Sequence, residues 1–152
     1  MPDDTTSAAL WVVLARSYHS MAAFVEQSIA SLDIGLSDFM ILEALLHKGP
    51  LSMSALCEAA LLANASMTSA IDRLEARHFV QRTPSKEDRR VKHIQLTPEG
   101  TALIKRLYAR HLRDLDEVMA TIPTTDRTEA RRTLKSIGLA AQSLTAERKS
   151  TP

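Results

Sequence analysis

The sequence predicts a mainly α-helical chain with a small β-hairpin in its second half. Apolar residues recur at three- and four-residue steps through most of the chain, which is the period of an amphipathic helix. Two short segments after His78 alternate apolar and polar residues instead, as strands do. With 152 residues, 45% hydrophobic and 24% charged, the chain has the size and balance of one globular domain, so we expect a single domain over residues 1–152.

A long helix is predicted first. Its apolar stripe is formed by Leu10, Leu14, Tyr18, Met21, Val25 and Ile29. Further apolar side chains lie off this stripe, namely Trp11, Val12, Val13 and Phe24. Because the helix is apolar on more than one face, we expect it to pack between partners.

Three shorter helices are predicted next. Gly35 ends the first region, and Ser37 is the expected N-cap of the second helix. Lys48-Gly49-Pro50 breaks that helix, and Ser52 can cap the third one. Residues 61–64 then form a tight turn into a fourth helix over about residues 65–77. Two short helices joined by a brief turn are typical of a helix-turn-helix.

A β-hairpin follows directly. Residues 79–83 and 92–97 both alternate in strand fashion, and the polar, charged loop between them contains Pro84. A helix-turn-helix followed by such a hairpin describes a winged helix, which we place at about residues 36–97.

Two helices complete the chain. Thr97 is the expected N-cap and Pro98 the first residue of a long helix that runs to Met119, and Pro123 separates it from a final helix beginning at Asp126. Residues 146–152 are polar, and we expect them to fray. The helices at about 8–32 and 98–146 carry more apolar surface than the small winged lobe can cover. We therefore expect them to form a homodimer, with a monomer whose terminal helices wrap the lobe as the alternative.

Composition excludes several classes. The formal net charge is only +1, so a surface that binds nucleic acid must be local. No run approaches the uninterrupted apolar length of a membrane span, and Pro2, Asp3 and Asp4 replace a basic leader, so we expect no membrane contact and a cytoplasmic location. The single cysteine excludes an intrachain disulfide and a multi-cysteine zinc site.

The chain resembles the MarR family of bacterial transcriptional regulators from about Leu10 to Leu144. The most specific segment is Asp88-Arg89-Arg90-Val91-Lys92-His93-Ile94-Gln95-Leu96-Thr97-Pro98-Glu99-Gly100, which is similar to that family's wing, return strand and helix start. Gly35-Leu36-Ser37, Gly49-Pro50-Leu51-Ser52 and Leu74-Glu75 also fit the pattern. The resemblance implies a dimer that binds a palindromic double-stranded DNA operator, most often as a repressor.

The residues themselves indicate where DNA would bind. Basic residues gather between Arg73 and Lys92, where they outnumber the acidic ones. The start of the fourth helix is small and polar, so we expect DNA contacts from Asn64, Ala65, Ser66, Thr68 and Ser69, although N-capping is the simpler role for one of them. Arg73 is expected to reach a phosphate or a guanine, with Ile71 and Leu74 facing the core.

The loop of the hairpin is the second expected DNA contact. The resemblance implies that Arg90 enters the minor groove and that Asp88 braces the loop by pairing with an arginine, with Lys86 and Arg89 beside them. An exposed surface ion pair is the simpler alternative for Asp88 and Arg90. One residue departs from the family pattern, because His78 occupies a position that usually holds glycine and tends to need positive φ.

A small-molecule site is implied by the resemblance as well. Family members commonly bind small aromatic or anionic molecules where the dimerisation helices meet the DNA-binding lobe. The candidate residues are Trp11, Tyr18, His19, Met40, His47 and His111, with a role in the core as the alternative for each. Cys57 lies on the apolar face of the third helix, which favours a buried structural role over a redox sensor.

An enzyme is the competing class, and the sequence offers it little. It contains no glycine-rich phosphate loop, no nucleophile elbow and no histidine pair at metal-ligand spacing, so we expect no catalytic residues, no metal and no cofactor. A helical dimer that binds only a protein partner remains the third class. Salt-dependent binding to duplex DNA would distinguish it from a regulator.

Overall fold

The structure is a computed structural model that describes residues 6–85 and 91–150, except for the side chains of Asn64, Ala65 and Ser150. Its elements are α1 (Ser7–Ala30), α2 (Leu36–Lys48), β1 (Leu51–Ser52), α3 (Met53–Ala60), α4 (Asn64–Ala76), β2 (Val80–Pro84), β3 (Lys92–Leu96), α5 (Pro98–Met119) and α6 (Thr124–Ser150). They form two compact units, Met1–Asp114 and Leu115–Pro152. The prediction of a mainly α-helical chain with a small β-structure is confirmed.

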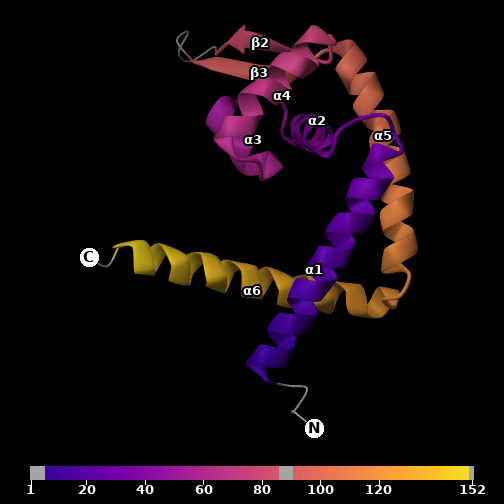
Figure 1. The fold of residues 1–152 in the computed structure, drawn as a ribbon, viewed down its shortest axis with the longest axis vertical. Coiled ribbons are helices and arrows are strands. Elements are labelled where there is room, and N and C mark those ends of the chain that lie inside the picture. The colour runs from indigo at the N-terminus through magenta and orange to yellow at the C-terminus, as the bar shows by residue number, and fades with distance from the viewer. Residues whose placement is uncertain (1–5, 86–90, 151–152) are drawn as a thin grey trace. The chain divides into compact units, whose positions relative to one another are not determined.

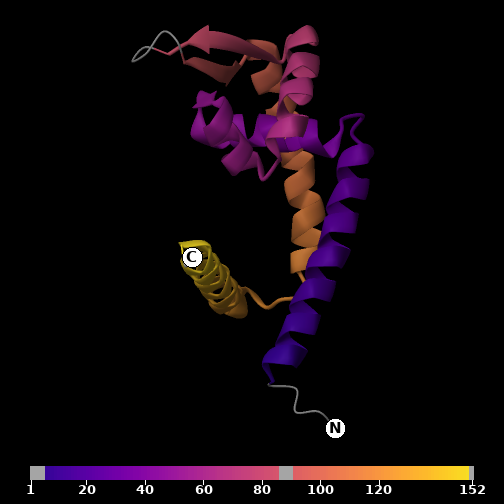
Figure 2. The same ribbon diagram turned by 60° about the vertical axis from the view of Figure 1, so that its left-hand side comes forward.

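The core of the first unit is built around α2. Phe39, Ile41 and Leu42 of this helix are almost fully buried. They pack with inward side chains from the surrounding elements, namely Leu56, Met67, Ile71, Leu74, Val80, Ile94 and Ile104. In both views of the ribbon, the β2–β3 hairpin and the start of α1 lie at opposite ends of this unit (Figures 1 and 2). The helix-turn-helix, α3 and α4, therefore packs against α2, and the hairpin lies next to α4.

The sheet has one more strand than the sequence predicts. β3 lies in the middle of an antiparallel sheet with the order β1-β3-β2. Leu51 pairs with Ile94 on one side of it, and Val80 pairs with Leu96 on the other. β1 is only two residues long, so it is too short to show an alternating pattern in the sequence.

Two N-cap predictions have different outcomes. Ser52 caps α3 as predicted, because its Oγ accepts a hydrogen bond from the backbone N–H of Ala55 at 3.3 Å. Ser37 does not cap α2, since that helix begins at Leu36 and its N-cap is Gly35, which makes no side-chain hydrogen bond. At the other end of the chain, α6 continues to Ser150, so the prediction of fraying from residue 146 is wrong.

A tight corner joins the end of α4 to the start of α5. His78 has a φ of 60°, so it adopts the left-handed conformation expected at this position. The Thr97 hydroxyl donates to the carbonyl oxygen of His78 at 2.6 Å and accepts from the N–H of Gly100 at 2.9 Å. The N–H of Thr97 donates to the carbonyl oxygen of Phe79 at 3.1 Å. These bonds fix the first turn of α5 against the residues that follow α4.

The C-terminal part of α1 is hydrogen-bonded to α5, whereas the N-terminal part of α1 is exposed. The Ser28 hydroxyl donates to Asp114, and Arg110 donates to the Ser31 hydroxyl at 3.4 Å. Trp11 and Tyr18 are 66% and 75% exposed.

By length and composition alone, α1 also meets the criteria for a membrane span, with 24 residues and a mean hydropathy of 1.2. The sequence prediction concerned an uninterrupted apolar run, which this measure does not require. The mean hydropathy of a window tolerates isolated polar residues such as Arg16 and His19, whereas an uninterrupted apolar run does not.

The second unit consists of α6 and the residues that lead into it. Arg127 donates from Nε to the carbonyl oxygen of Ile122 at 3.2 Å and from Nη2 to that of Met119 at 3.0 Å. These bonds connect the start of α6 to the last residue of α5 and to the loop that follows it. The apolar side chains along α6 are exposed, namely Leu134, Ile137, Leu139 and Leu144.

Candidate nucleic-acid interface

The helix α4 presents a polar face to solvent. Its inward face consists of Met67, Ala70, Ile71 and Leu74, all almost fully buried, which confirms the predicted core positions Ile71 and Leu74. Ser66, Thr68 and Ser69 are exposed on the other side. The helix N-cap is Ala63, which cannot cap through its side chain. The amide groups of the first turn are therefore without a side-chain cap at the end where DNA is expected to bind.

Arg73 joins α4 to α2. Its Nε donates to Oδ2 of Asp38 at 3.2 Å, and its Nη2 donates to Oδ1 at 2.5 Å. The hydrogen bond to Asp38 and the charge of that carboxylate raise the pKa of Arg73 above its ordinary value. Arg73 therefore does not extend freely into solvent, which the sequence did not indicate.

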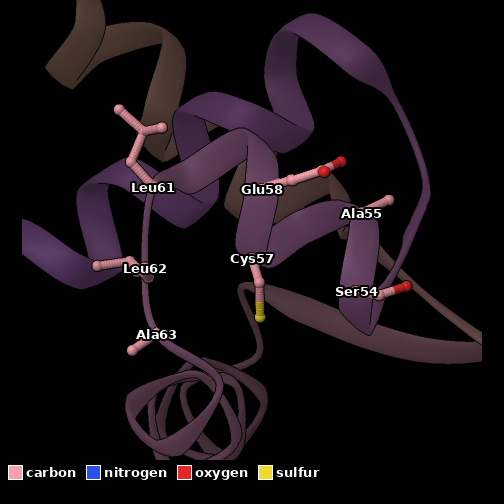
Figure 3. Close-up of a pocket in the computed structure, with 7 residues that line it drawn as sticks. All are labelled: Ser54, Ala55, Cys57, Glu58, Leu61, Leu62 and Ala63. Carbon is pink, nitrogen blue, oxygen red and sulfur yellow. The ribbon is translucent and has the colours of Figure 1, made fainter. Parts of the chain in front are cut away.

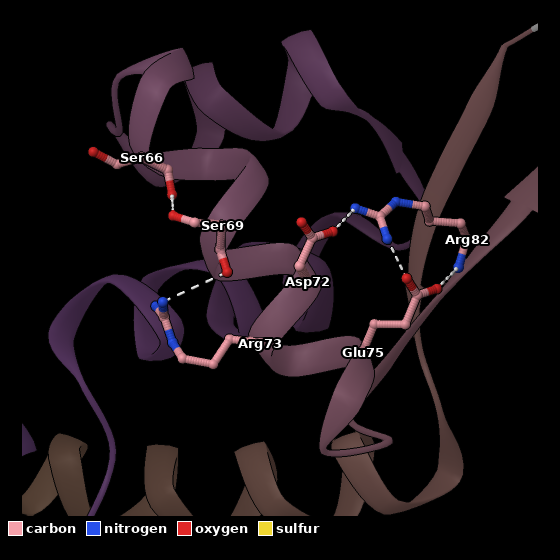
Figure 4. A network of polar contacts seen from close by, with 6 residues as sticks. All are labelled: Ser66, Ser69, Asp72, Arg73, Glu75 and Arg82. Carbon is pink, nitrogen blue, oxygen red and sulfur yellow. Dashed lines mark hydrogen bonds and ion pairs between the residues drawn. The ribbon is translucent and has the colours of Figure 1, made fainter.

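Arg82 joins β2 to the other side of α4. Its Nη2 donates to Oδ1 of Asp72 at 2.5 Å, and its Nη1 donates to Glu75, as Figure 4 shows. The backbone N–H of Arg82 also donates to Glu75, at 3.1 Å. The hydrogen bond to Asp72, together with the charges of both carboxylates, raises the pKa of Arg82. The hairpin is thus attached to α4 by charged hydrogen bonds.

These ion pairs change the expected charge of the surface. Two arginines of the basic segment, Arg73 and Arg82, are neutralised by carboxylates, and Arg77 lies 4.9 Å from the centre of the Phe79 ring. The sequence count from Arg73 to Lys92 left out Asp38 and Asp72, because they lie outside that segment in the chain. Folding brings Asp38 beside it, whereas Asp72 directly precedes it in the chain.

The hairpin loop has a defined base. The N–H of Ser85 donates to the carbonyl oxygen of Val91 at 2.8 Å, and Pro84 pairs with Lys92. The predicted wing residues Lys86, Asp88, Arg89 and Arg90 lie outside the described residues, as do the side chains of Asn64 and Ala65. Their roles stay predictions.

The six candidate effector residues are not brought together. Trp11, Tyr18 and His19 are exposed on α1, and Met40 is half-buried against the core. His47 packs edge-on against Tyr108, with ring centres 4.9 Å apart. His111 is buried against Phe39 at 5.1 Å, and among the described residues its Nδ1 has no hydrogen-bond partner.

An open groove that sequence reasoning missed lies along α3. It has a volume of about 750 Å³ and is lined by Ser54, Ala55, Cys57, Glu58, Leu61, Leu62 and Ala63. Figure 3 shows these side chains coming from α3 and from the turn that follows it. Cys57, for which the sequence favoured a buried structural role, is half-buried at this groove.

Comparison with known proteins decides the family. A model of the MarR family matches residues 34–92, the segment from the end of the α1–α2 turn to the first residue of β3. MhqR, a helix-turn-helix transcriptional regulator of Bacillus subtilis, is 30% identical over 136 residues, which cover 90% of this chain and 94% of MhqR. The chain belongs to the MarR family.

Two further proteins agree with this MarR-family assignment. The transcriptional repressor NicR of Pseudomonas putida is 30% identical over 105 residues, 68% of this chain and 66% of NicR. A structure of BpsR from Bordetella bronchiseptica, whose DNA binding is regulated by 6-hydroxynicotinic acid, has a TM-score of 0.73 at 22% identity and covers 91% of this chain and 96% of that one. This MarR-family chain is therefore a DNA-binding transcriptional regulator with a winged helix-turn-helix fold.

Proposed function

We propose that this chain is a homodimeric repressor that binds a palindromic operator and is released by a small aromatic or anionic molecule. The observation that supports the proposal most directly concerns α4. Ion pairs hold this helix on both sides, and it exposes the side chains of Ser66, Thr68 and Ser69. A fixed helix with small polar residues at its N-terminal end suits a major groove. The chain would act by binding, without catalysis, in the cytoplasm where its bacterial relatives meet their DNA.

Exposed apolar side chains support the homodimer. α1 exposes Leu10, Trp11, Val13 and Tyr18, and α6 exposes Leu134, Ile137, Leu139 and Leu144. Apolar surface of this extent on a soluble regulator is typical of an interface with another subunit. A twofold axis would give two copies of α4, which is what a palindromic operator requires.

The residue roles follow from position. We assign Asn64, Ala65, Ser66, Thr68 and Ser69 to the major groove, as residues of the first turns of α4. We assign Arg90 to the minor groove, with Lys86 and Arg89 near phosphates and Asp88 bracing the loop, because residues 86–90 connect the paired ends of β2 and β3.

An effector site is proposed at the helices that join the dimer to the DNA-binding lobe. Its residues would be Trp11, Tyr18, His19, Met40, His47 and His111, which one subunit does not bring together, so a second subunit would have to complete the site. Of these, His111 offers a buried ring nitrogen without a partner among the described residues. The regulation of BpsR by 6-hydroxynicotinic acid supports an anionic aromatic molecule as the ligand class. Titrating the DNA complex with such acids and following DNA release tests this part of the proposal.

The function is tested with an operator recovered by selecting bound duplexes from a random pool. We expect a palindromic site, and we expect Arg90→Ala to weaken binding to it at least about tenfold in a gel-shift titration, since each lost groove contact of an arginine costs roughly that much. Arg131→Ala on α6 removes the same charge from a residue to which we assign no DNA contact, and it should leave the affinity unchanged. Equal affinities for the wild type and Arg90→Ala would refute the wing assignment.

A further inference from the structure

We propose that Asp38 is a positioning residue for DNA recognition, which holds the Arg73 guanidinium in place to bind one phosphate of the operator. The inference rests on the proposed function, because it concerns how α4 meets DNA. It assigns a role in binding to a buried carboxylate on α2, a helix that does not itself face the groove.

The first step is the geometry of the pair. Nε and Nη2 of Arg73 donate to the two different oxygens of Asp38, at 3.2 and 2.5 Å. This parallel, two-point contact fixes the plane of the guanidinium as well as its position. A single hydrogen bond would leave the group free to rotate.

The second step is burial. The Asp38 side chain is 4% exposed, whereas that of Arg73 is 52% exposed. Asp38 lies in the first turn of α2, where the positive end of the helix dipole favours a negative charge. The carboxylate is thus the fixed partner, and the guanidinium is the partner with one side open to solvent.

The third step is where the guanidinium lies along α4. Nη1 of Arg73 donates to the carbonyl oxygen of Ser69 at 3.5 Å, one turn nearer the N-terminus of the helix. Figure 4 shows Arg73 pointing away from Asp72 and Arg82, on the other side of the helix. The charge is therefore held beside Ser69, at the level of the residues that we assign to the groove.

The fourth step is the donors that remain. A guanidinium has five N–H groups, of which two face Asp38 and one faces Ser69. The others have no acceptor within the part of the chain that the structure describes. Because the group lies on the flank of α4 toward α2, we assign its external acceptor to a backbone phosphate and not to a base edge.

We expect Asp38 to affect binding to the operator more than binding to other DNA. Asp38 reduces the net positive charge, so it does not increase the attraction to DNA in general. It instead removes the need to order a long side chain when the operator binds, which lowers the entropic cost of that one contact. Because the held guanidinium meets a phosphate only in the fixed register of the operator complex, Asp38 improves operator binding relative to unrelated DNA.

The test measures the affinity for a selected operator and for an unrelated duplex of equal length over a series of salt concentrations. We expect Arg73→Ala to reduce the slope of log K against log salt by about 1, as the loss of one phosphate contact does. We expect Asp38→Asn to weaken operator binding about three- to tenfold and to move the slope toward the Arg73→Ala value, with no weakening on the unrelated duplex. In an Arg73→Ala background, Asp38→Asn should change nothing further.

Asp33→Asn is the matched control. It removes the same charge five residues earlier, at a φ of 58° that asparagine also adopts, and should leave both affinities unchanged. Circular dichroism verifies folding at the assay temperature, and Asp38→Glu, which displaces the carboxylate by one methylene, replaces Asp38→Asn if that variant unfolds.

Three results would overturn the inference while the proposed function stands. The slope could stay unchanged in Arg73→Ala. Asp38→Asn could weaken binding equally in the presence and absence of Arg73, which would indicate a structural role alone. Arg73→Ala could relax base preference at one operator position, which would indicate a base contact. If the wild type binds no duplex, the proposed function fails, and this inference fails with it.

Discussion

Gly100 illustrates how a single residue fixes the path of the chain between α4 and α5. A Cβ atom at this position would lie 1.9 Å from the carbonyl oxygen of Phe79, which is far inside any allowed contact. That oxygen already accepts a hydrogen bond from Thr97, so it cannot move away without breaking the corner. Glycine is required here for close approach of two backbone segments and not for its φ angle.

We expect Gly100→Ala to lower the free energy of unfolding by about 1–3 kcal/mol, because the added methyl group has to displace the backbone of Phe79. Urea unfolding followed by circular dichroism measures the effect. Gly138→Ala is the matched control, since no atom lies within 4 Å of the added Cβ on α6. It should be neutral or stabilise by up to about 1 kcal/mol through helix propensity. Equal effects of the two substitutions would show that the close contact is not rigid.

At the scale of the elements, the sequence pattern predicted which segments are helices better than where they begin. The Ser52 cap could be predicted because a serine after a Gly-Pro break has few other roles. The Ser37 cap was wrong because α2 begins two residues earlier than a cap at Ser37 would allow, with Phe39 and its neighbours packed into the core. β1 exists only through its pairing with β3, which no local pattern encodes.

The sequence predicted the local features of the candidate site but not its contacts between elements. The small polar residues at the start of α4 are a local feature and could be read directly from the sequence. The partner of Arg73 lies 35 residues away on another helix, so its identity depends on the tertiary fold. The pairing of Arg82 with Asp72 and Glu75 likewise depends on how β2 lies against α4.

The cap of α3 provides a prediction for an element. Ser52→Ala should lower the free energy of unfolding by about 1 kcal/mol, because the N–H of Ala55 loses its acceptor. Thermal unfolding monitored at 222 nm, roughly the helical minimum, measures the change. Ser54→Ala is the control within the same turn, where only a contact with the Ser52 hydroxyl is lost and alanine favours the helix. A loss for Ser54→Ala as large as that for Ser52→Ala would argue against the cap.

At the scale of the whole molecule, the exposed apolar side chains of α1 need a partner. The same helix meets the length and hydropathy criteria of a membrane span, so a second subunit and a lipid bilayer are distinct candidates for covering it. Membership of a family of DNA-binding regulators favours the second subunit.

We expect Trp11→Glu to shift the protein from dimer to monomer in sedimentation equilibrium, because a charge would be buried at the interface. Ser17→Glu adds the same charge at another exposed position of α1 and provides the control. A mass of one subunit for the wild type would refute the homodimer, and an unchanged dimer for Trp11→Glu would place its interface elsewhere. Detergent-dependent solubility of the wild type would favour the membrane instead.

The corner at Gly100 also determines how motion can pass through the DNA-binding lobe. Thr97 bonds to both His78 and Phe79, and the space between the two backbones is too small for a single methyl group. A rotation of the first turns of α5 must therefore rotate the end of α4 with it, because the two segments move as one rigid body. A disturbance arriving along α5 would reach the DNA as a change in the tilt of the reading helix and not as its local melting.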